Sequence, residues 1–265
     1  MRRLVPALLL LPLLSGCVDP SVQPPLRPLT EAELRPFYVD SPPQPLPAYT
    51  AFTLGESYVP GGTVQGWKAT NVVPLYSSRG QNVVLAAHLQ PDGRITGAAP
   101  LQTGPAETLQ YTLSMNGNNA LAGGLCPVDG LKATAGVKVH LPELAFFFYR
   151  FAEVQQAMQP LTSPIPKERG LRYDLRAYEQ PSSQVGINLV YVSDDVTVQG
   201  EQRCVRGYEQ SGRSSASQDN IRVNLKLSRG WNALLRTETR SYAGQTHVSH
   251  ITWTTVPRDV IERWL

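Results

Sequence analysis

Short segments in which apolar and polar side chains alternate dominate the second half of this chain. The clearest segment runs from Ile221 to Leu227, with apolar residues at odd positions and polar residues at even positions. A period of two is typical of a strand that buries one face. Turn-forming residues separate such segments, as in Pro91–Gly93 and Arg229–Gly230. The pattern predicts roughly ten to twelve strands and an all-β fold, an antiparallel β-sandwich with a barrel as the alternative.

The remaining segments complete this expectation. Arg206–Asp219 is rich in Ser and Gly, which predicts a loop. Pro257–Leu265 predicts a short C-terminal helix, because proline near its start and Asp259 in the first turn suit a helix N-terminus. The aromatic stretch 137–151 predicts a strand, followed by a short helix at 152–158. Further strands are expected at residues 82–89, 108–115, 171–178, 187–192, 232–240 and 247–253.

The N-terminus has the order of a secretory signal. Arg2 and Arg3 precede an apolar run, Leu4–Leu14, which is too short for the ~20 residues that span a bilayer as a helix. The run ends in Leu14-Ser15-Gly16-Cys17, which resembles the lipobox of bacterial lipoproteins. The resemblance implies that residues 1–16 are removed and that Cys17 carries the lipid. The residue after Cys17 is Val18 rather than aspartate, which by the same resemblance favours the outer membrane where the cell has one.

Prolines crowd the segment after Cys17, so we expect residues 17–49 to form an extended tether. One interruption, Thr30–Leu34, reads as a capped helical turn, and Phe37 and Tyr38 are candidates for docking on the domain. A wholly disordered tether is the alternative. Residues 50–265 then form the β-rich domain, as one sandwich or two smaller ones.

With Cys17 assigned to the anchor, Cys126 and Cys204 are the two remaining cysteines. Thiols tend to pair in the oxidising compartments outside the cytoplasm, so we predict a Cys126–Cys204 disulfide. Two buried free thiols are the alternative.

The overall charge gives no reason to expect a nucleic-acid partner. The chain holds 24 basic and 21 acidic residues, and loss of Arg2 and Arg3 with the signal brings the two nearly into balance. Nucleic-acid binding rests on clustered positive charge that neutralises phosphates. Partners are therefore sought at the membrane, through the lipid, and among envelope proteins or glycans.

No local motif predicts a catalytic residue, a metal site or a cofactor. The four histidines are His88, His140, His247 and His250; the last two are three apart, which on a strand places them on opposite faces. Asp194-Asp195 is typical of a turn rather than of a catalytic pair. Trp231 directly follows Arg229-Gly230 and is the best candidate for an exposed ligand or partner contact.

Two short stretches carry a further resemblance. Gly62–Gly66 and the Asp92–Arg94 turn resemble the opening of prealbumin-like or carboxypeptidase-regulatory-like β-sandwiches. Val196–Gly200 and Leu227–Asn232 resemble stretches of uncharacterised β-rich bacterial lipoproteins. These resemblances imply a fold and no activity.

Taken together, the sequence predicts a lipid-anchored, extracytoplasmic β-sandwich that acts without catalysis as a structural or protein-binding module of the cell envelope. One alternative is a glycan-binding module, which requires a row of exposed Trp or Tyr rings. A second is a hydrolase with a scattered site, which requires a cleft that holds a titratable group with a perturbed pKa.

Overall fold

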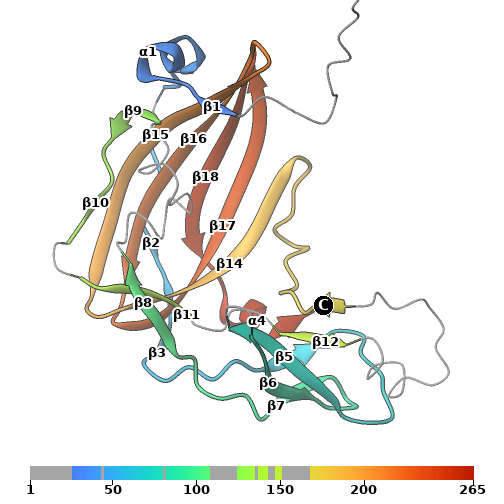
Figure 1. The fold of residues 1–265 in the computed structure, drawn as a ribbon. Helices are drawn as coiled ribbons and strands as arrows, with labels where there is room; N and C mark the ends of the chain where they lie inside the picture. The colour runs from blue at the N-terminus through green and yellow to red at the C-terminus, as the bar shows by residue number, and fades with distance from the viewer. Residues whose placement is uncertain are drawn as a thin grey trace, which may run out of the picture.

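The computed structural model confirms an all-β fold made of two curled sheets with very little helix (Figure 1). The structure describes residues 26–42, 45–79, 82–107, 124–134, 137–142, 147–150 and 168–265. The strand expected at 108–115 and the helix expected at 152–158 lie outside these residues.

The large sheet is built around five long strands in the order β15, β16, β18, β17, β14. Strand β1 flanks β15 at one end, and β11 and then β8 follow β14 at the other. Short strands add to the edges of this path: β9 and β10 pair with β15, β2 with β16 and β3 with β17. The strand bounds are β1 Arg27–Pro28, β2 Tyr49–Thr50, β3 Phe52–Gly55, β8 Thr103–Glu107, β9 Leu125–Asp129, β10 Lys132–Ala133, β11 Val139–Pro142, β14 Ser183–Val192, β15 Val196–Gln210, β16 Arg213–Leu227, β17 Gly230–Ala243 and β18 Thr246–Thr255.

The pairing is mostly antiparallel, with parallel exceptions. Strands β16 and β18 pair in parallel, although the chain reaches β18 through a β17–β18 hairpin. Strand β2 also runs parallel to β16. The expected antiparallel pairing therefore holds for most strands, and two parallel pairs make the large sheet mixed in the described part of the chain.

The expected loop at Arg206–Asp219 is wrong, because this stretch forms most of the long β15–β16 hairpin. The two strands pair without interruption from Val196↔Leu227 to Gln210↔Arg213. Ser211 and Gly212 make the turn with φ of +54° and +73°, the left-handed conformations of a two-residue type I′ hairpin. Serine has a weak intrinsic preference for strands, but partners on both sides supply the ladder that this composition does not predict.

The small sheet has the order β13, β12, β5, β6, β7, β4, β19. Its last strand comes from the chain end, which pairs in parallel with β4. The helix expected at 257–265 is thus confirmed only as one turn, α4 (Arg258–Ile261), before the chain extends again. The strand bounds are β4 Gly62–Val64, β5 Val73–Arg79, β6 Asn82–Leu89, β7 Arg94–Thr96, β12 Phe148–Arg150, β13 Glu168–Gly170 and β19 Arg263–Trp264.

The strand expected at 171–178 is also wrong. Only Tyr173 makes a β-bridge, with Trp264, and the chain then turns, with the Tyr178 amide donating to the Leu175 carbonyl. Leu171 and Leu175 are buried by packing rather than by a ladder. The alternation therefore predicted burial correctly as far as Leu175, but Ala177 is exposed and the expected strand is absent.

Both faces of the large sheet are partly apolar. One face carries a cluster around Val190, Ile221, Leu225 and Trp253. The opposite face carries Ala233 and Leu235, which pack with Val260 and Ile261 of α4 in a cluster that includes Tyr173. This second cluster holds the small sheet and the chain end against the large sheet, whereas the small sheet has its own core.

The first part of the expected tether is folded onto the large sheet. Residues 26–42, the N-terminal strap, begin with β1 and continue through the helical turn α1 (Glu31–Leu34) and a 3-10 turn, Arg35–Phe37. Thr30 and Glu33 form a capping box, which confirms the predicted helical turn. Leu34 is fully buried beside Leu29. A wholly disordered tether is therefore excluded for these residues.

Polar contacts fix the strap further along. The buried amide side chain of Gln218 accepts from the Val39 amide at 2.7 Å and donates to the Val39 carbonyl at 2.7 Å. Thr246 donates to the Phe37 carbonyl at 2.8 Å, and Arg203 pairs with Asp40 at 2.7 Å. Backbone groups of the strap thus form the hydrogen bonds that the buried side chains Gln218 and Thr246 of the sheet require.

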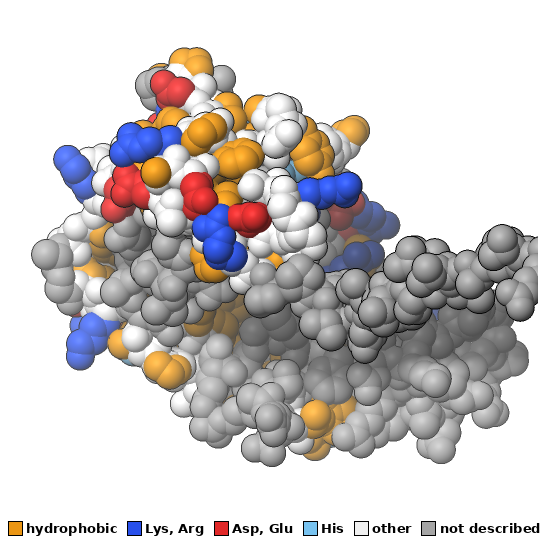
Figure 2. Space-filling model, turned by 45° about the horizontal axis from the view of Figure 1, so that its top comes forward, with side chains coloured by type: hydrophobic (Ala, Val, Ile, Leu, Met, Phe, Trp, Pro, Cys, Tyr) orange, Lys and Arg blue, Asp and Glu red, His pale blue; other side chains and the backbone are white. Residues whose placement is uncertain are grey.

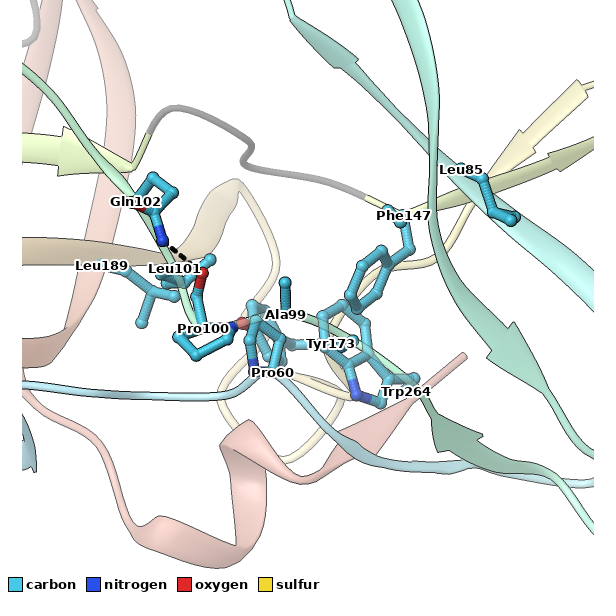
Figure 3. A pocket seen from close by; sticks show the side chains of 12 residues that line it. Pro60, Leu85, Ala99, Pro100, Leu101, Gln102, Phe147, Tyr173, Leu189 and Trp264 are labelled. Carbon is cyan, nitrogen blue, oxygen red and sulfur yellow. Dashed lines mark hydrogen bonds between the residues drawn. The ribbon is translucent and has the colours of Figure 1, made fainter.

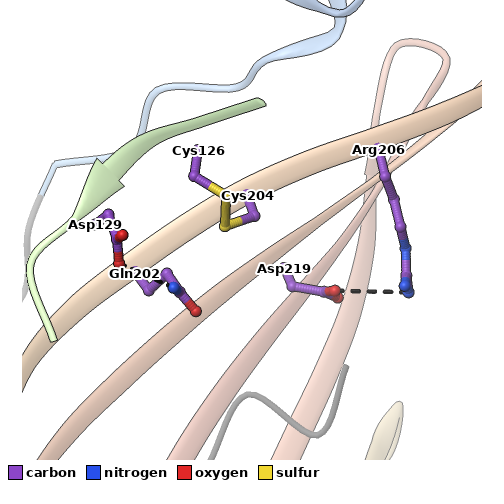
Figure 4. The surroundings of a disulfide bond; sticks show 6 residues. All are labelled: Cys126, Asp129, Gln202, Cys204, Arg206 and Asp219. Carbon is purple, nitrogen blue, oxygen red and sulfur yellow. Dashed lines mark hydrogen bonds and ion pairs between the residues drawn. A yellow bond between two sulfur atoms is a disulfide. The ribbon is translucent and has the colours of Figure 1, made fainter. Parts of the chain in front are cut away.

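The predicted disulfide is confirmed: Cys126 on β9 is bonded to Cys204 on β15 (Figure 4). The two cysteines are 78 residues apart, with Cα atoms 4.0 Å apart. Gln202, on the same strand, donates to Asp129 at 3.0 Å and fastens β9 a second time. The bond ties a short edge strand to the longest hairpin of the sheet.

The described surface mixes charges of both signs. On the face shown in Figure 2, acidic and basic side chains lie beside one another. The described ion pairs at the surface include Arg27–Glu33 and Arg35–Glu31. Among the described residues, no helix has the length and apolar character needed to cross a bilayer.

Candidate functional site

An apolar pocket lies where the two sheets meet (Figure 3). The small sheet contributes Leu85 from β6 and Trp264 from β19, and the large sheet contributes Leu189 from β14. The empty space amounts to about 700 Å³, counting the solvent at its mouth. The full lining is Pro60, Leu85, Ala86, Ala98, Ala99, Pro100, Leu101, Gln102, Phe147, Tyr173, Leu189 and Trp264.

The chain end positions the main aromatic wall of this pocket. After α4, the backbone of Glu262 passes so close to Gly62 that a Cβ there would lie 2.1 Å from the Glu262 oxygen. Gly62 also has a φ of +114°, so glycine is required at this position. This close approach lets β19 pair with β4 and brings Trp264 against Tyr173 and Phe147.

The three rings form a compact group. Tyr173 stacks on Trp264 with ring centroids 4.2 Å apart, and Phe147 lies 5.7 Å from Trp264 in a tilted arrangement. The indole N–H of Trp264 donates to the Gly61 carbonyl at 2.8 Å. Gln102 donates to the Pro100 carbonyl at 3.2 Å, as the dashed line in Figure 3 marks. The indole N–H of Trp264 and one N–H of the Gln102 amide are therefore engaged with backbone carbonyls.

No lining side chain is charged at neutral pH. Tyr173 is the one titratable residue among them, and burial, with a smaller contribution from Tyr58, raises its pKa. Burial and the nearby Glu262 also raise the pKa of Tyr58 to about 12. Both phenols stay neutral over the physiological range, so the pocket offers shape and apolar contact rather than acid–base chemistry.

A second group of polar and ionisable side chains lies on the large sheet, around Glu238 of β17. Its carboxylate accepts from Arg240 at 2.6 Å, from Arg236 at 2.7 Å and from Ser249 at 3.1 Å. Burial alone would raise the pKa of Glu238, but the hydrogen bonds from Arg240 and Arg236 outweigh it and lower the pKa to about 2. Such a carboxylate stays ionised and paired, which suits a structural ion-pair network better than proton transfer.

The expectation that Trp231 is an exposed contact is wrong. Its side chain has no exposed area and lies 5.5 Å, edge to face, from Tyr191. Gly230 turns the chain with a φ of +99° directly before it, but strands β3 and β14 pair with β17 on both sides at this point. The hairpin position is as predicted, whereas the edge strand β3 covers a residue that a two-stranded tip would leave open.

The other sequence candidates lie apart from the pocket. Asp195 accepts from the Arg229 amide at 2.8 Å, which confirms a turn role. His247 contacts the Tyr242 ring, His250 lies beside Asn220, and His140 bonds the Gly104 carbonyl. Within the described ranges no group of three or more metal-ligating side chains is found. Cys17 lies outside the described residues.

Comparison of the chain with protein-family models, with curated proteins and with solved structures gives no match. The pocket and its surroundings therefore carry the functional argument.

Sequence reasoning missed the pocket because no local pattern encodes it. Its lining residues come from sequence positions between 60 and 264 and from both sheets. The one signal in the sequence is Ala98-Ala99-Pro100, a run of small residues that leaves room between two strands. This run of small residues indicates a pocket only together with the pairing of the chain end, β19, with β4.

Proposed function

We propose that this protein is a lipid-anchored, non-enzymatic binding module of the cell envelope that holds an apolar ligand between its two sheets. The observation that carries the proposal is the uncharged, apolar lining of the pocket around Trp264 and Phe147. Ligand sites in proteins are mostly apolar clefts with a few polar groups. Here those polar groups are Gln102 and Tyr173.

The same lining argues against the glycan-binding alternative at this site. A sugar needs hydrogen-bond partners around the ring on which it stacks, and burying hydroxyls without partners is costly. Trp264 and Gln102 already donate to backbone carbonyls. Trp231 and Trp253 have no exposed area. Trp264 is almost fully buried and Trp67 is half-buried, so the described residues present no row of open tryptophan rings.

The hydrolase alternative has its best candidate in Glu238, and the electrostatics there favour a structural role. A general acid or base works best with a pKa near the working pH. The pKa of Glu238 is instead lowered to about 2 by its hydrogen bonds, against the effect of burial. The carboxylate would remain charged and bound to arginine throughout a reaction at neutral pH.

The anchor is the second part of the proposal and rests on the signal and on Cys17. Acylation at this residue would hold the domain at an extracytoplasmic membrane surface, the outer membrane where the cell has one. More than one acyl chain is expected on Cys17, since a single chain gives only marginal binding.

Metabolic labelling with radioactive palmitate tests the anchor. We expect label on the wild-type protein, none on the Cys17→Ala variant, and release of that variant from the membrane fraction. Ser21→Ala, four residues further along, is the matched control and should keep both label and location. A wild-type chain that takes up no label, or a Cys17→Ala chain that keeps it, would refute lipid attachment at this residue.

A further inference from the structure

The strap sets how far the domain can stand from a lipid surface. Because residues 26–42 are docked on the large sheet, Cys17 precedes the docked chain by only nine residues. Nine residues span at most about 30 Å when fully extended. The maximum distance between the domain and its anchor is therefore much shorter than a tether of residues 17–49 would allow. The domain accordingly works next to the leaflet that holds its anchor.

The strand register relates the tether to the pocket. Strand β1 pairs with Tyr208 and Glu209, at the same end of the sheet as the β17–β18 turn. The pocket residue Leu189 pairs with Ala233, ten residues along β17 from Ala243. At about 3.4 Å per residue, pocket and strap lie roughly 34 Å apart along the strands. A tether of similar length lets the domain lie on its long side, with the pocket at the lipid.

Exposed apolar side chains gather around the pocket mouth. Leu85 lines the pocket and is 56% exposed, and Val83, two residues earlier on the same face of β6, is 47% exposed. Val59, 48% exposed, directly precedes the lining residue Pro60. Large apolar side chains that stay in water next to an apolar cavity mark a contact surface for another apolar phase.

We propose that the pocket takes one acyl chain of a phospholipid from the leaflet that anchors the protein, while Val59, Val83 and Leu85 rest on the lipid surface. This inference rests on the proposed lipid anchor, which fixes the distance to the leaflet. An acyl chain matches the lining because it needs no hydrogen bond and no counter-charge. The charged headgroup stays at the mouth, in water.

Two probes test the occupant separately from the anchor. The first is the acylated full chain in vesicles of phosphatidylcholine brominated on one acyl chain, where bromine quenches tryptophan emission at short range. Both proteins compared carry Trp67→Phe, which removes the half-buried Trp67 from the emission. We expect quenching of this Trp67→Phe protein and little quenching once Trp264→Phe is added, because Trp231 and Trp253 are fully buried elsewhere. The second is parinaric acid, a fluorescent fatty acid, added to the full chain with Cys17→Ser.

Variants at two exposed alanines separate filling of the pocket from general effects. Ala99 lines the pocket and Ala133 lies exposed on β10 of the large sheet. Ala99→Phe should exclude about three methylenes and weaken parinaric acid binding roughly fifty-fold. Ala133→Phe should bind as wild type does. In vesicles, Leu85→Ser should reduce quenching, whereas Tyr242→Ser, which alters an exposed ring on β17, should not.

The outcomes are distinct. Quenching that depends on Trp264 and is lost in Ala99→Phe supports the proposal. Parinaric acid binding without vesicle quenching of the acylated chain identifies a free fatty acid as the ligand and overturns the membrane source. Equal behaviour of Ala99→Phe and Ala133→Phe with both probes overturns acyl binding in this pocket. Absence of palmitate on the wild-type chain would instead refute the lipid anchor. Acyl binding in the pocket would then be tested by parinaric acid binding alone.

Discussion

Truncation of Leu34 to alanine should release the strap while the large sheet stays folded. Leu34 is the fully buried residue of α1, packed with Leu29, Val205 and Ala216. Replacement of a buried leucine by alanine costs about 2–5 kcal/mol. Ordering each residue of the strap already costs about 1–2 kcal/mol of chain entropy, so its net docking energy is small. A loss of this size at Leu34 should therefore shift the strap towards its released state.

Amide hydrogen exchange measures this release residue by residue. The Leu29 amide donates to the Gly207 carbonyl at 3.0 Å, and the Val39 amide donates to Gln218 at 2.7 Å. A loss of 2–5 kcal/mol should speed their exchange between about thirty-fold and several thousand-fold. Val223, in the centre of β16, should exchange as slowly as in wild type.

A matched control lies one residue along. Arg35 has a side chain that is 70% exposed and pairs with Glu31 at the surface. Arg35→Ala should therefore change the Val39 exchange rate by less than about five-fold, since exposed ion pairs contribute about 0–1 kcal/mol. An unchanged rate at Val39 in Leu34→Ala would refute the account of the strap, and with it the short tether. A rate that rises equally at Val223 would show that strap and sheet unfold as one unit.

Three further predictions concern stability. In urea denaturation, Trp231→Ala should lower the free energy of unfolding by about 3–5 kcal/mol, because the ring is fully buried. Tyr242→Ala, which alters an 81% exposed ring, should lower it by less than about 1 kcal/mol. Equal losses in the two variants would contradict the burial of Trp231. The double variant Cys126→Ser, Cys204→Ser should have a free energy of unfolding about 4 kcal/mol lower than wild type, the loop-closure value for a 78-residue separation. A decrease of less than about 1 kcal/mol would mean that the loop is already constrained without the disulfide. Folding lowers the pKa of Glu238 from 4.5 to about 2, so the ionised carboxylate stabilises the fold above pH 4.5 and this stabilisation is lost as the pH falls towards 2. Over this interval the free energy of unfolding of wild type should fall by up to about 3 kcal/mol more than that of Glu238→Gln. Parallel plots of unfolding free energy against pH for the two proteins would contradict the ion pairing of Glu238.

The sequence was sufficient where local pattern and burial agree. The alternation at Ile221–Leu227, the turn at Arg229–Gly230 and the β17–β18 hairpin were all predicted and are all present. The disulfide followed from the number of cysteines and their compartment. Each of these features depends on residues that are close in sequence or on a pairing with no competitor.

Prediction failed where distant parts of the chain decide the structure. Arg206–Asp219 has the composition of a loop, but β15 and β16 pair with each other through it, and β1 and β18 add hydrogen bonds on its two outer sides. Trp231 has the position of an exposed tip residue, but β3 covers it. Partners contributed from other parts of the chain cannot be read from the segment itself.

The candidate site was beyond sequence reasoning for a related cause. Trp264 reaches the pocket only because Gly62 lets the chain end pass close to β4. Leu189 reads simply as part of a buried strand, and Ala99 as part of a loop. The proposed anchor, by contrast, rests on a local pattern, the lipobox resemblance around Cys17.

Site-specific photo-crosslinking in intact cells tests the central claim most directly. A benzophenone side chain placed at the exposed Val83 lies beside the pocket mouth without filling the pocket, and the same group at Ala133 lies on β10 of the large sheet. We expect a covalent adduct at position 83 that is absent at position 133 and that is lost when Ala99→Phe fills the pocket. Irradiated protein without an adduct at position 83, or with equal adducts at both positions, would contradict a binding site between the two sheets.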